Sequence, residues 1–217
     1  MLALCVLGAS PLHGQPDRPP IAELIAALQA KYDAVRNFSA AFEQTYAGGV
    51  LRTTLVERGT VLIKKPGKMR WHYTSPEEKL FVSDGVSLYS YIPADRQVIV
   101  GTVPPGDSVS TPTLFLAGRG NLSRDFVAAY DESLDPPPRT WAVELIPTRQ
   151  DVDYTRLTLV VDRASLSVLQ LRATDFQNAV SAFTFSGLEE NRDLPDALFS
   201  FAIPPGTEIV TGDDFGR

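Results

Sequence analysis

Residues 59–91, GTVLIKKPGKMRWHYTSPEEKLFVSDGVSLYSY, constrain the fold more than any other part of the chain. They read as consecutive antiparallel strands, because apolar and β-branched runs are separated by turn residues. Pro66-Gly67 combines a fixed φ angle with a permissive one and predicts a tight reversal. Asp84-Gly85 is the residue pair that a two-residue type I′ hairpin needs. The apolar residues of this stretch exceed one core face, which predicts a concave apolar sheet.

A helix is predicted before the first strand. Apolar residues recur there at three- and four-residue spacing, at Ile21, Leu24, Ile25, Leu28, Tyr32 and Val35. This period is typical of an amphipathic helix. Pro19 and Pro20 suit its first turn or the approach to it, and Asn37 lies where the helix would stop. From Phe38 the period changes to two, and Gly48-Gly49 then marks a hairpin.

About eleven strands are predicted in all, with short connections that make sequential strands neighbours in the sheet. Residues 112–130 interrupt the β pattern, because Pro112 can open a short helix, Gly118 can close it, and Asn121 or Ser123 can cap another. These helices are the expected lid of the sheet. After the first hairpins the predicted strands are 96–103, 141–146, 156–161, 168–173, 179–187 and 198–203.

Composition predicts one domain over residues 21–217, preceded by a leader and linker over residues 1–20. The chain has 217 residues, of which 44% are hydrophobic, enough to bury a sizeable core. Its net charge of −6 argues against a nucleic-acid partner, which requires clustered Lys and Arg. Cys5 is the only cysteine, so an internal disulfide and a Cys-based metal site are both excluded.

The first ten residues, MLALCVLGAS, resemble the hydrophobic region of a secretory signal that ends in small residues. No Lys or Arg precedes Arg18, so the basic region of such a signal is missing. We therefore expect an exported protein with an incomplete leader or a start site assigned too late; an unstructured tail is the alternative. Lipidation of Cys5 is disfavoured because Leu4 is bulky where a small residue is needed.

The sequence predicts no enzymatic activity and no cofactor. Its two histidines are His13, in the leader, and His72, in a strand, so neither a Ser-His-Asp triad nor a His-based metal cluster can form. Carboxylates occur side by side, as at Glu77-Glu78, but adjacent strand residues face opposite sides of a sheet. They cannot act together on one substrate, and we interpret them as solvated charge.

The apolar strand faces are the stronger signal. Met69, Trp71 and Tyr73 alternate with charged residues on the strand that follows Pro66-Gly67. Neighbouring strands supply further apolar residues to the predicted face, namely Val61, Ile63, Phe81, Tyr89 and Tyr91. These side chains either fill a closed sandwich core or line a cavity in a curved, incompletely closed barrel. The residues alone leave both interpretations open.

Several segments resemble one protein family. KKPGKMRWHYTSP, VSDGVSLYSY, Gln97-Val98 and STPTLFLAG (110–118) are similar to segments of the outer-membrane lipoprotein carrier family, LolA. The resemblance runs from about residue 32 to residue 210. It implies a mainly β fold with some α: a single curved antiparallel sheet forming a half-open β-barrel of about eleven strands. A lid of about three helices would cover this sheet and enclose an apolar cavity.

The resemblance also implies a function. Carriers of this kind are periplasmic and hold the acyl chains of lipoproteins between sheet and lid. The implied partners are acylated lipoproteins as cargo, an inner-membrane ABC-type release complex and an outer-membrane receptor. We also expect a monomer, since a soluble carrier must wrap its cargo. A carrier of glycolipids or other lipids, a lipoprotein-sensing regulatory module on the same fold, and a plain structural β-domain remain alternatives.

The resemblance assigns roles to particular residues. A basic residue in the family's Lys-Arg-Pro segment holds the lid shut until cargo arrives, and Lys65 occupies that position here. Lysine presents a flexible point charge where arginine presents a planar fork of donors; an ordinary charged residue beside a turn is the alternative. Met69 would lie near the cavity mouth, either as a gap-filler or as an adaptable lipid contact. The predicted lid residues, for which ordinary helix packing is the alternative, are Pro112, Leu114, Phe115 and Leu116.

Overall fold

The computed structural model describes residues 18–48, 53–103, 120–149 and 153–211. Its strands are β1 (Asn37–Gly48), β2 (Thr53–Lys64), β3 (Lys68–Ser75), β4 (Lys79–Asp84), β5 (Ser87–Ile92), β6 (Gln97–Thr102), β7 (Phe126–Tyr130), β8 (Thr140–Pro147), β9 (Arg156–Asp162), β10 (Val168–Thr174), β11 (Val180–Glu190) and β12 (Glu208–Thr211). Its helical elements are α1 (Ile21–Ala34), the 3-10 helix η1 (Pro93–Asp95), α3 (Leu122–Asp125) and the 3-10 helix η2 (Asp196–Phe199).

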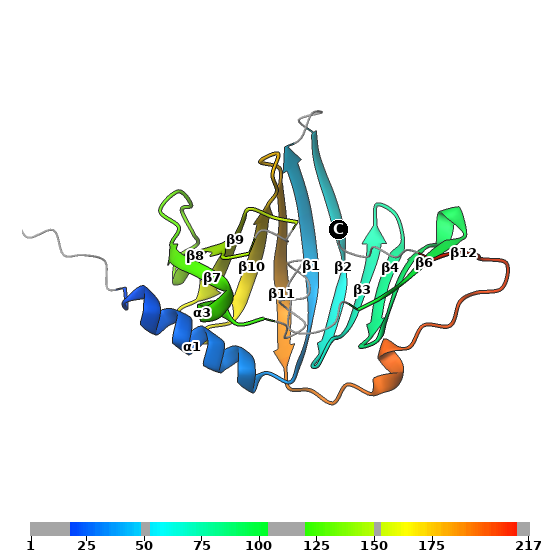
Figure 1. Ribbon diagram of the computed structural model, residues 1–217, viewed down its shortest axis with the longest axis horizontal. Helices are drawn as coiled ribbons and strands as arrows, with labels where there is room; N and C mark the ends of the chain where they lie inside the picture. The colour runs from blue at the N-terminus through cyan, green and yellow to red at the C-terminus, as the bar shows by residue number, and fades with distance from the viewer. Residues whose placement is uncertain (1–17, 49–52, 104–119, 150–152, 212–217) are drawn as a thin grey trace, which may run out of the picture.

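The strands form one twelve-stranded sheet in the order β12-β6-β5-β4-β3-β2-β1-β11-β10-β9-β8-β7. Every neighbouring pair is antiparallel except β12 and β6, which run parallel. The two edge strands lie at opposite ends of the molecule, so the sheet does not close (Figure 1). The predicted single open sheet is confirmed.

The predicted count of about eleven strands is close to the observed one, although the individual strands differ. Residues 198–203, predicted as a strand, form the end of η2 and an extended segment instead. Two strands that were not predicted, β7 and β12, make up the difference. The segment of β7 favours a helix in sequence because Asn121 is a good N-cap, and its side chain does accept a hydrogen bond from Arg124 N at 2.9 Å. That helix, α3, ends at Asp125, where the backbone becomes extended.

Helix α1 begins at Ile21 as predicted and packs on one face of the sheet. Leu24, Ile25 and Leu28 are its buried residues, and they belong to the same hydrophobic cluster as the sheet. We call this side of the sheet the inner face and the opposite side the outer face. In the part of the chain that the structure describes, α1 and the four-residue α3 are the only α-helices, so a lid of about three helices is not confirmed. The predicted lid residues Pro112, Leu114, Phe115 and Leu116 lie outside the described residues.

The hairpin at Asp84-Gly85 differs from the type I′ prediction. Gly85 has the expected positive φ of 100°, but Asp84 does not. Instead, the Asp84 carboxylate accepts hydrogen bonds from Val86 N at 2.8 Å and Ser87 N at 2.7 Å. The last paired residues are Ser83 and Leu88, so the side chain of Asp84 organises a wider turn.

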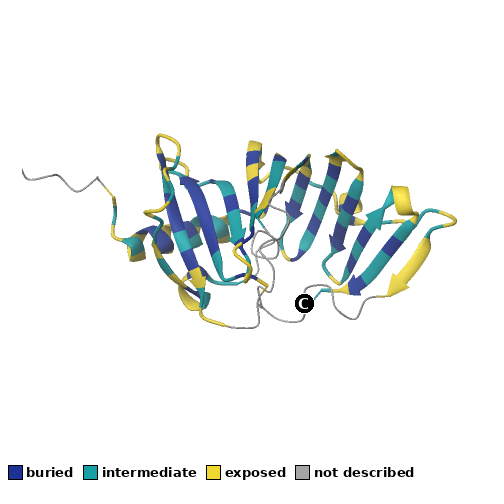
Figure 2. Cartoon of the chain, turned by 90° about the horizontal axis from the view of Figure 1, so that it is seen from above, coloured by how far each residue is buried: buried dark blue, intermediate teal, exposed yellow. Residues whose placement is uncertain are grey.

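A segment that we call the C-terminal strap, residues 191–207, crosses the outer face of the sheet. Asp196 accepts hydrogen bonds from Lys64 at 2.6 Å and Lys68 at 2.7 Å. The ring of Phe199 is only 1% exposed. Beyond it the strap leads to β12, which pairs with β6 at the sheet edge (Figure 2). The strap therefore gives the outer face its own apolar cover, separate from the inner face.

The pair of lysines at Asp196 predicts a pH-dependent contribution to stability. Their hydrogen bonds lower the pKa of Asp196 from 3.8 to about 2. Because the folded-state pKa lies below the ordinary value, the ion pairs stabilise the fold above about pH 4 and are lost as pH falls toward about 2. Asp196→Asn should therefore lower the urea midpoint near neutral pH and approach wild type in strong acid. A midpoint difference that stays constant from neutral pH to about pH 2 would contradict this assignment.

Candidate functional site

The strand register places six of the predicted cavity residues together on the inner face. Ile63 lies opposite Met69, Val61 opposite Trp71, and Trp71 opposite Phe81. Residues that are directly opposite in a ladder, and residues two apart on one strand, share a face. All but the half-buried Phe81 are buried. The inner-face set is Val61, Ile63, Met69, Trp71, Tyr73 and Phe81.

Tyr89 and Tyr91 do not belong to this set. Phe81 lies opposite Ser90, so the two tyrosines point to the outer face. There each ring lies 5.5 Å from the ring of Phe201 in the strap. The prediction that they line the inner face is wrong, because it assumes that the bulkier residues of SLYSYI face inward. Their large rings pack against the strap on the outer face and do not line a cavity on the inner face.

Five aromatic side chains from three strands meet on the inner face. We call them the aromatic cluster: Phe42, Trp71, Tyr73, Phe183 and Phe185. The Phe42 ring centroid lies 4.8 Å from Tyr73 and 5.1 Å from Trp71, and Trp71 lies 5.2 Å from Phe183. Edge-to-face packing of this kind adds about 0.5–1.5 kcal/mol per pair beyond the burial of area. The two phenylalanines of β11 were not predicted as site residues, because nothing local in the sequence shows that β11 pairs with β1.

Gly59 makes room for this cluster. It lies opposite Phe42 on one side and Tyr73 on the other. A Cβ atom at this position would lie 2.1 Å from the carbonyl oxygen of His72 and 2.9 Å from Cε1 of Phe42. Only a residue without a side chain therefore fits beneath the Phe42 ring.

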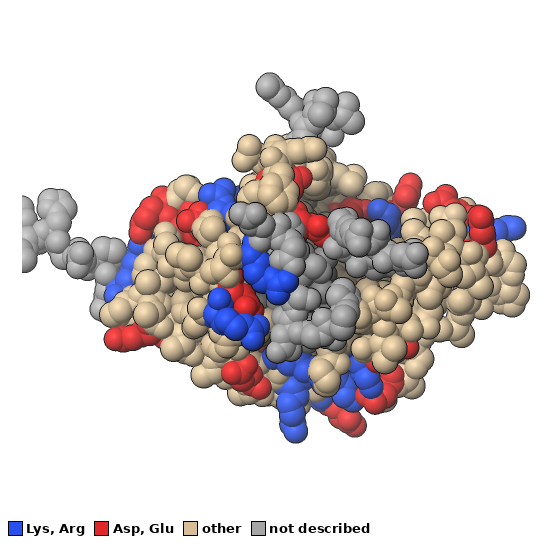
Figure 3. Space-filling model, in the orientation of Figure 1, with Lys and Arg blue, Asp and Glu red and all other residues tan. Residues whose placement is uncertain are grey.

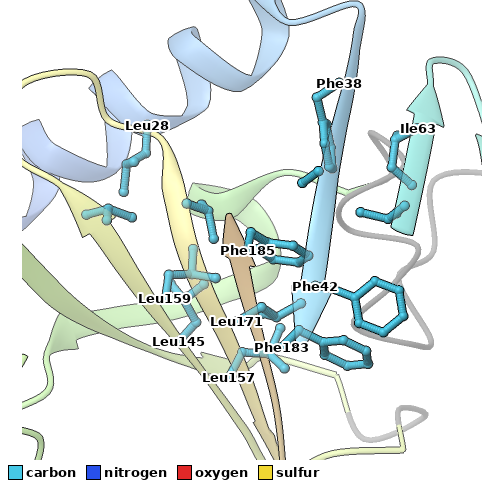
Figure 4. Close-up of a cluster of buried hydrophobic side chains, with 14 of the residues drawn as sticks. Leu28, Phe38, Phe42, Ile63, Leu145, Leu157, Leu159, Leu171, Phe183 and Phe185 are labelled. Carbon is cyan, nitrogen blue, oxygen red and sulfur yellow. The ribbon is translucent and has the colours of Figure 1, made fainter. Parts of the chain in front are cut away.

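Aliphatic residues continue the inner face toward the other end of the sheet. Leu145, Leu157, Leu159 and Leu171 come from β8, β9 and β10 and are at most 1% exposed. Figure 4 shows Leu28 of α1 on the same side of the sheet as these leucines, with the phenylalanines of β1 and β11 beyond them. The inner face thus has an aromatic half and an aliphatic half in one continuous apolar surface.

A row of polar side chains borders the aromatic cluster, and we call it the polar row: Gln44, Glu57, Tyr73, Lys79 and Ser181. Tyr73 donates its hydroxyl hydrogen to Gln44 at 2.7 Å, and Gln44 donates to Ser181 at 2.9 Å. Lys79 donates to Glu57 at 2.5 Å. Burial raises the pKa of the Tyr73 hydroxyl, and the carboxylate of Glu57 raises it further. The polar row therefore borders the aromatic cluster, while beyond Ser181 the same register continues into Ala173 and Leu157.

Lys65 reaches helix α1. Its ammonium group donates a hydrogen bond to the backbone carbonyl of Tyr32 and lies 5.2 Å from the centre of the Tyr32 ring. A cation suits the last turn of a helix, where carbonyl groups lack intrahelical partners. Burial lowers the pKa of Lys65, and the charge of Asp33 opposes this shift. Lys65 therefore fastens the end of α1 to the β2–β3 hairpin.

Two further kinds of site were sought among the described residues, a metal centre and a membrane-spanning helix. Figure 3 shows positive and negative side chains interspersed over the described part of this face. Over residues 18–48, 53–103, 120–149 and 153–211, no cluster of three His, Cys, Asp or Glu side chains could hold a metal ion. Within the same ranges, no helix is both long and apolar enough to cross a membrane.

Residues 33–202 match the family described as "Outer membrane lipoprotein carrier protein LolA". A protein of Chromobacterium violaceum named "Outer-membrane lipoprotein carrier protein" is 30% identical over 195 residues, which cover 90% of this chain and 91% of that protein. One of the same name from Cupriavidus taiwanensis is 28% identical over 186 residues, covering 84% and 85%. The crystal structure of an uncharacterized conserved protein from Thermus thermophilus has the same fold, with a TM-score of 0.53 at 14% identity, covering 88% of this chain and 99% of that one. The chain therefore belongs to the LolA family of outer membrane lipoprotein carrier proteins.

Proposed function

We propose that this protein is a periplasmic lipoprotein carrier that binds acyl chains on the inner face of its sheet. The observation that carries the proposal is the continuous apolar surface formed by the aromatic cluster and the leucines of β8–β10. Membership in the LolA family, with relatives named as lipoprotein carriers, supports acylated lipoproteins as the cargo. The absence of enzymatic activity is part of the same proposal.

The physics of acyl chains explains why a carrier is needed. Each buried methylene group contributes about 0.8 kcal/mol, so a sixteen-carbon chain contributes on the order of 12 kcal/mol when it is fully enclosed. Unassisted transfer through water is therefore slow. Release requires that part of the apolar surface becomes exposed again, which offsets much of this binding energy.

The transport route is a further part of the proposal. The carrier would accept lipoproteins from an inner-membrane ABC-type release complex and deliver them to an outer-membrane receptor, acting as an exported monomer. Met69 would lie near the mouth of the binding surface, and residues 112–116 would contribute to its cover. Lys65 would control opening through its contact with α1, because that hydrogen bond joins the helix to the hairpin beside Met69.

The identity of the cargo tests this proposal. The full chain should be expressed with a functional leader in a Gram-negative periplasm, purified without detergent, and analysed by mass spectrometry for bound molecules. We expect triacylated lipoprotein at close to one per protein molecule. Free glycolipid or another lipid would replace the lipoprotein proposal with a lipid-carrier function. A protein that is empty, and that fails to keep added purified lipoprotein in solution, would overturn the carrier function altogether.

A further inference from the structure

The aromatic cluster contains a buried hydrogen-bond donor with no acceptor among the described residues. In the part of the chain that the structure describes, three buried side-chain polar atoms have no hydrogen-bond partner: Asn37 Oδ1, Trp71 Nε1 and Trp141 Nε1. Folded proteins satisfy the large majority of such atoms, so each exception requires an explanation. Trp71 is the most notable of the three, because it is 2% exposed and lies in the middle of the inner face.

The described surroundings of Trp71 do not supply a protein acceptor. Its ring packs against Phe42, Phe183 and Phe185, with centroids 5.1, 5.2 and 6.4 Å away. The polar row begins two residues along the same strand, at Tyr73, but its members are already paired with one another. Within residues 18–48, 53–103, 120–149 and 153–211, the indole N–H is therefore unpaired at the place where the proposed cargo would lie.

We propose that Trp71 Nε1–H donates a hydrogen bond to an acyl carbonyl oxygen of the bound cargo. The inference rests on the proposed function, since it concerns the same binding surface. An acyl chain carries a single strong acceptor, the ester or amide carbonyl at its head, and an indole N–H is a donor only. A ligand that pairs this donor in an apolar site gains affinity over one that leaves it unpaired. Trp71 thus selects acyl-linked lipids.

The same placement orients the cargo. Residues two apart on a strand are separated by about 7 Å. A carbonyl held at Trp71 would therefore lie about this distance from Tyr73, the nearest member of the polar row. The polar groups that adjoin this carbonyl would then lie near Gln44 and Lys79. The hydrocarbon of the lipid would extend across the sheet, over the phenylalanines of β11 and the buried leucines of β8–β10.

The other two unpaired atoms are less suited to this role. Asn37 Oδ1 is an acceptor and cannot bind a carbonyl. Trp141 lies on β8, away from the aromatic cluster, and the guanidinium of Arg163 stacks 5.5 Å from its ring centre. Trp141 is therefore a matched control, because it is the other tryptophan of the chain and its N–H is also unpaired among the described residues.

The test compares two lipids that differ only at the carbonyl. Binding of 1-hexadecanoylglycerol, an ester, and 1-O-hexadecylglycerol, the matching ether, should be measured for wild type, Trp71→Phe and Trp141→Phe. We expect wild type and Trp141→Phe to prefer the ester by about five- to tenfold, the value of one hydrogen bond. Trp71→Phe keeps an aromatic ring but lacks the N–H, and it should bind the two lipids equally.

A second measurement uses the wild-type protein and therefore does not require any variant to fold. The two indole N–H resonances of wild type can be followed by ¹⁵N NMR, and that of Trp71 should move downfield with the ester but not with the ether. Equal affinity of wild type for both lipids, an ester preference retained in Trp71→Phe, or an unchanged Trp71 resonance in the ester complex would each overturn the inference. Those results leave acyl binding intact, whereas failure of wild type to bind either lipid overturns the proposed function as well.

Discussion

Gly59→Ala is expected to destabilise the protein by about 3 kcal/mol or more, the upper range for overpacking a well-packed site. The added methyl group would lie 2.1 Å from the carbonyl oxygen of His72, a backbone atom of the paired strand. A side-chain rotation cannot relieve this contact, so β2 and β3 would have to separate. The Phe42 ring, whose Cε1 would lie 2.9 Å from the new methyl group, would also be displaced from the aromatic cluster.

Urea unfolding measures this effect, and Thr60→Ala is the matched control. Thr60 is the next residue of the same strand and is exposed on the outer face, so its replacement should cost less than about 1 kcal/mol. The two variants should differ clearly in midpoint with similar slopes. If Gly59→Ala unfolded at the same urea concentration as Thr60→Ala, the packing of Phe42 over Gly59 would not be as described.

Met69→Glu is expected to abolish cargo binding. Met69 is 7% exposed and lies on the inner face between Ile63 and Ser83. A carboxylate at this nearly buried position must keep water beside it, and excluding that water with an acyl chain costs several kcal/mol unless the group is paired. Binding should therefore weaken by more than about a hundredfold, at about 1.4 kcal/mol per factor of ten. Bound acyl cargo per protein molecule, measured by mass spectrometry, should fall below detection.

Two controls separate loss of binding from loss of folding. Met69→Leu conserves the volume and apolar character of the side chain, so it should keep its cargo. Val127→Glu places the same charge at a residue that is 64% exposed, and it should behave like wild type. A folded Met69→Glu protein, verified by circular dichroism, that carries the wild-type amount of cargo would show that Met69 does not contact the acyl chains.

The fold could be predicted from the sequence where local patterns determine the structure. The hairpins at Pro66-Gly67 and Asp84-Gly85 combine turn residues with strands of period two, and both form. Helix α1 begins and buries its apolar side as its spacing predicts. These elements depend on the conformational preferences and spacing of residues that are close together in the sequence.

Other elements depend on distant contacts and were missed. The strap carries apolar residues at 199–203 that favour a strand, yet Phe199 and Phe201 cover the outer face, where Asp196 is held by lysines of the β2–β3 hairpin. β12 is a short exposed strand whose partner, β6, is more than a hundred residues earlier. Neither arrangement leaves a periodic signal in its own segment.

The candidate site shows the same division. The alternation on β3 correctly places Met69, Trp71 and Tyr73 on one face, and the pairing of β2, β3 and β4 adds their neighbours. The sequence does not determine which residues of β5 face the inner side of the sheet, because either Tyr89 or Ser90 can occupy such a position. Phe183 and Phe185 were missed as site residues because the pairing of β1 with β11 follows only from the order of the whole sheet.

The central claim is that acyl chains lie against the aromatic cluster on the inner face, and quenching of Trp71 tests it most directly. A Trp141→Phe background leaves Trp71 as the single tryptophan. An acylglycerol with a brominated chain should be compared with its unbrominated equivalent, since bromine quenches indole fluorescence only at contact distance. The account predicts strong quenching by the brominated lipid at concentrations where both lipids bind. Bound brominated lipid that leaves Trp71 fluorescence unchanged would place the acyl chains elsewhere and contradict the account.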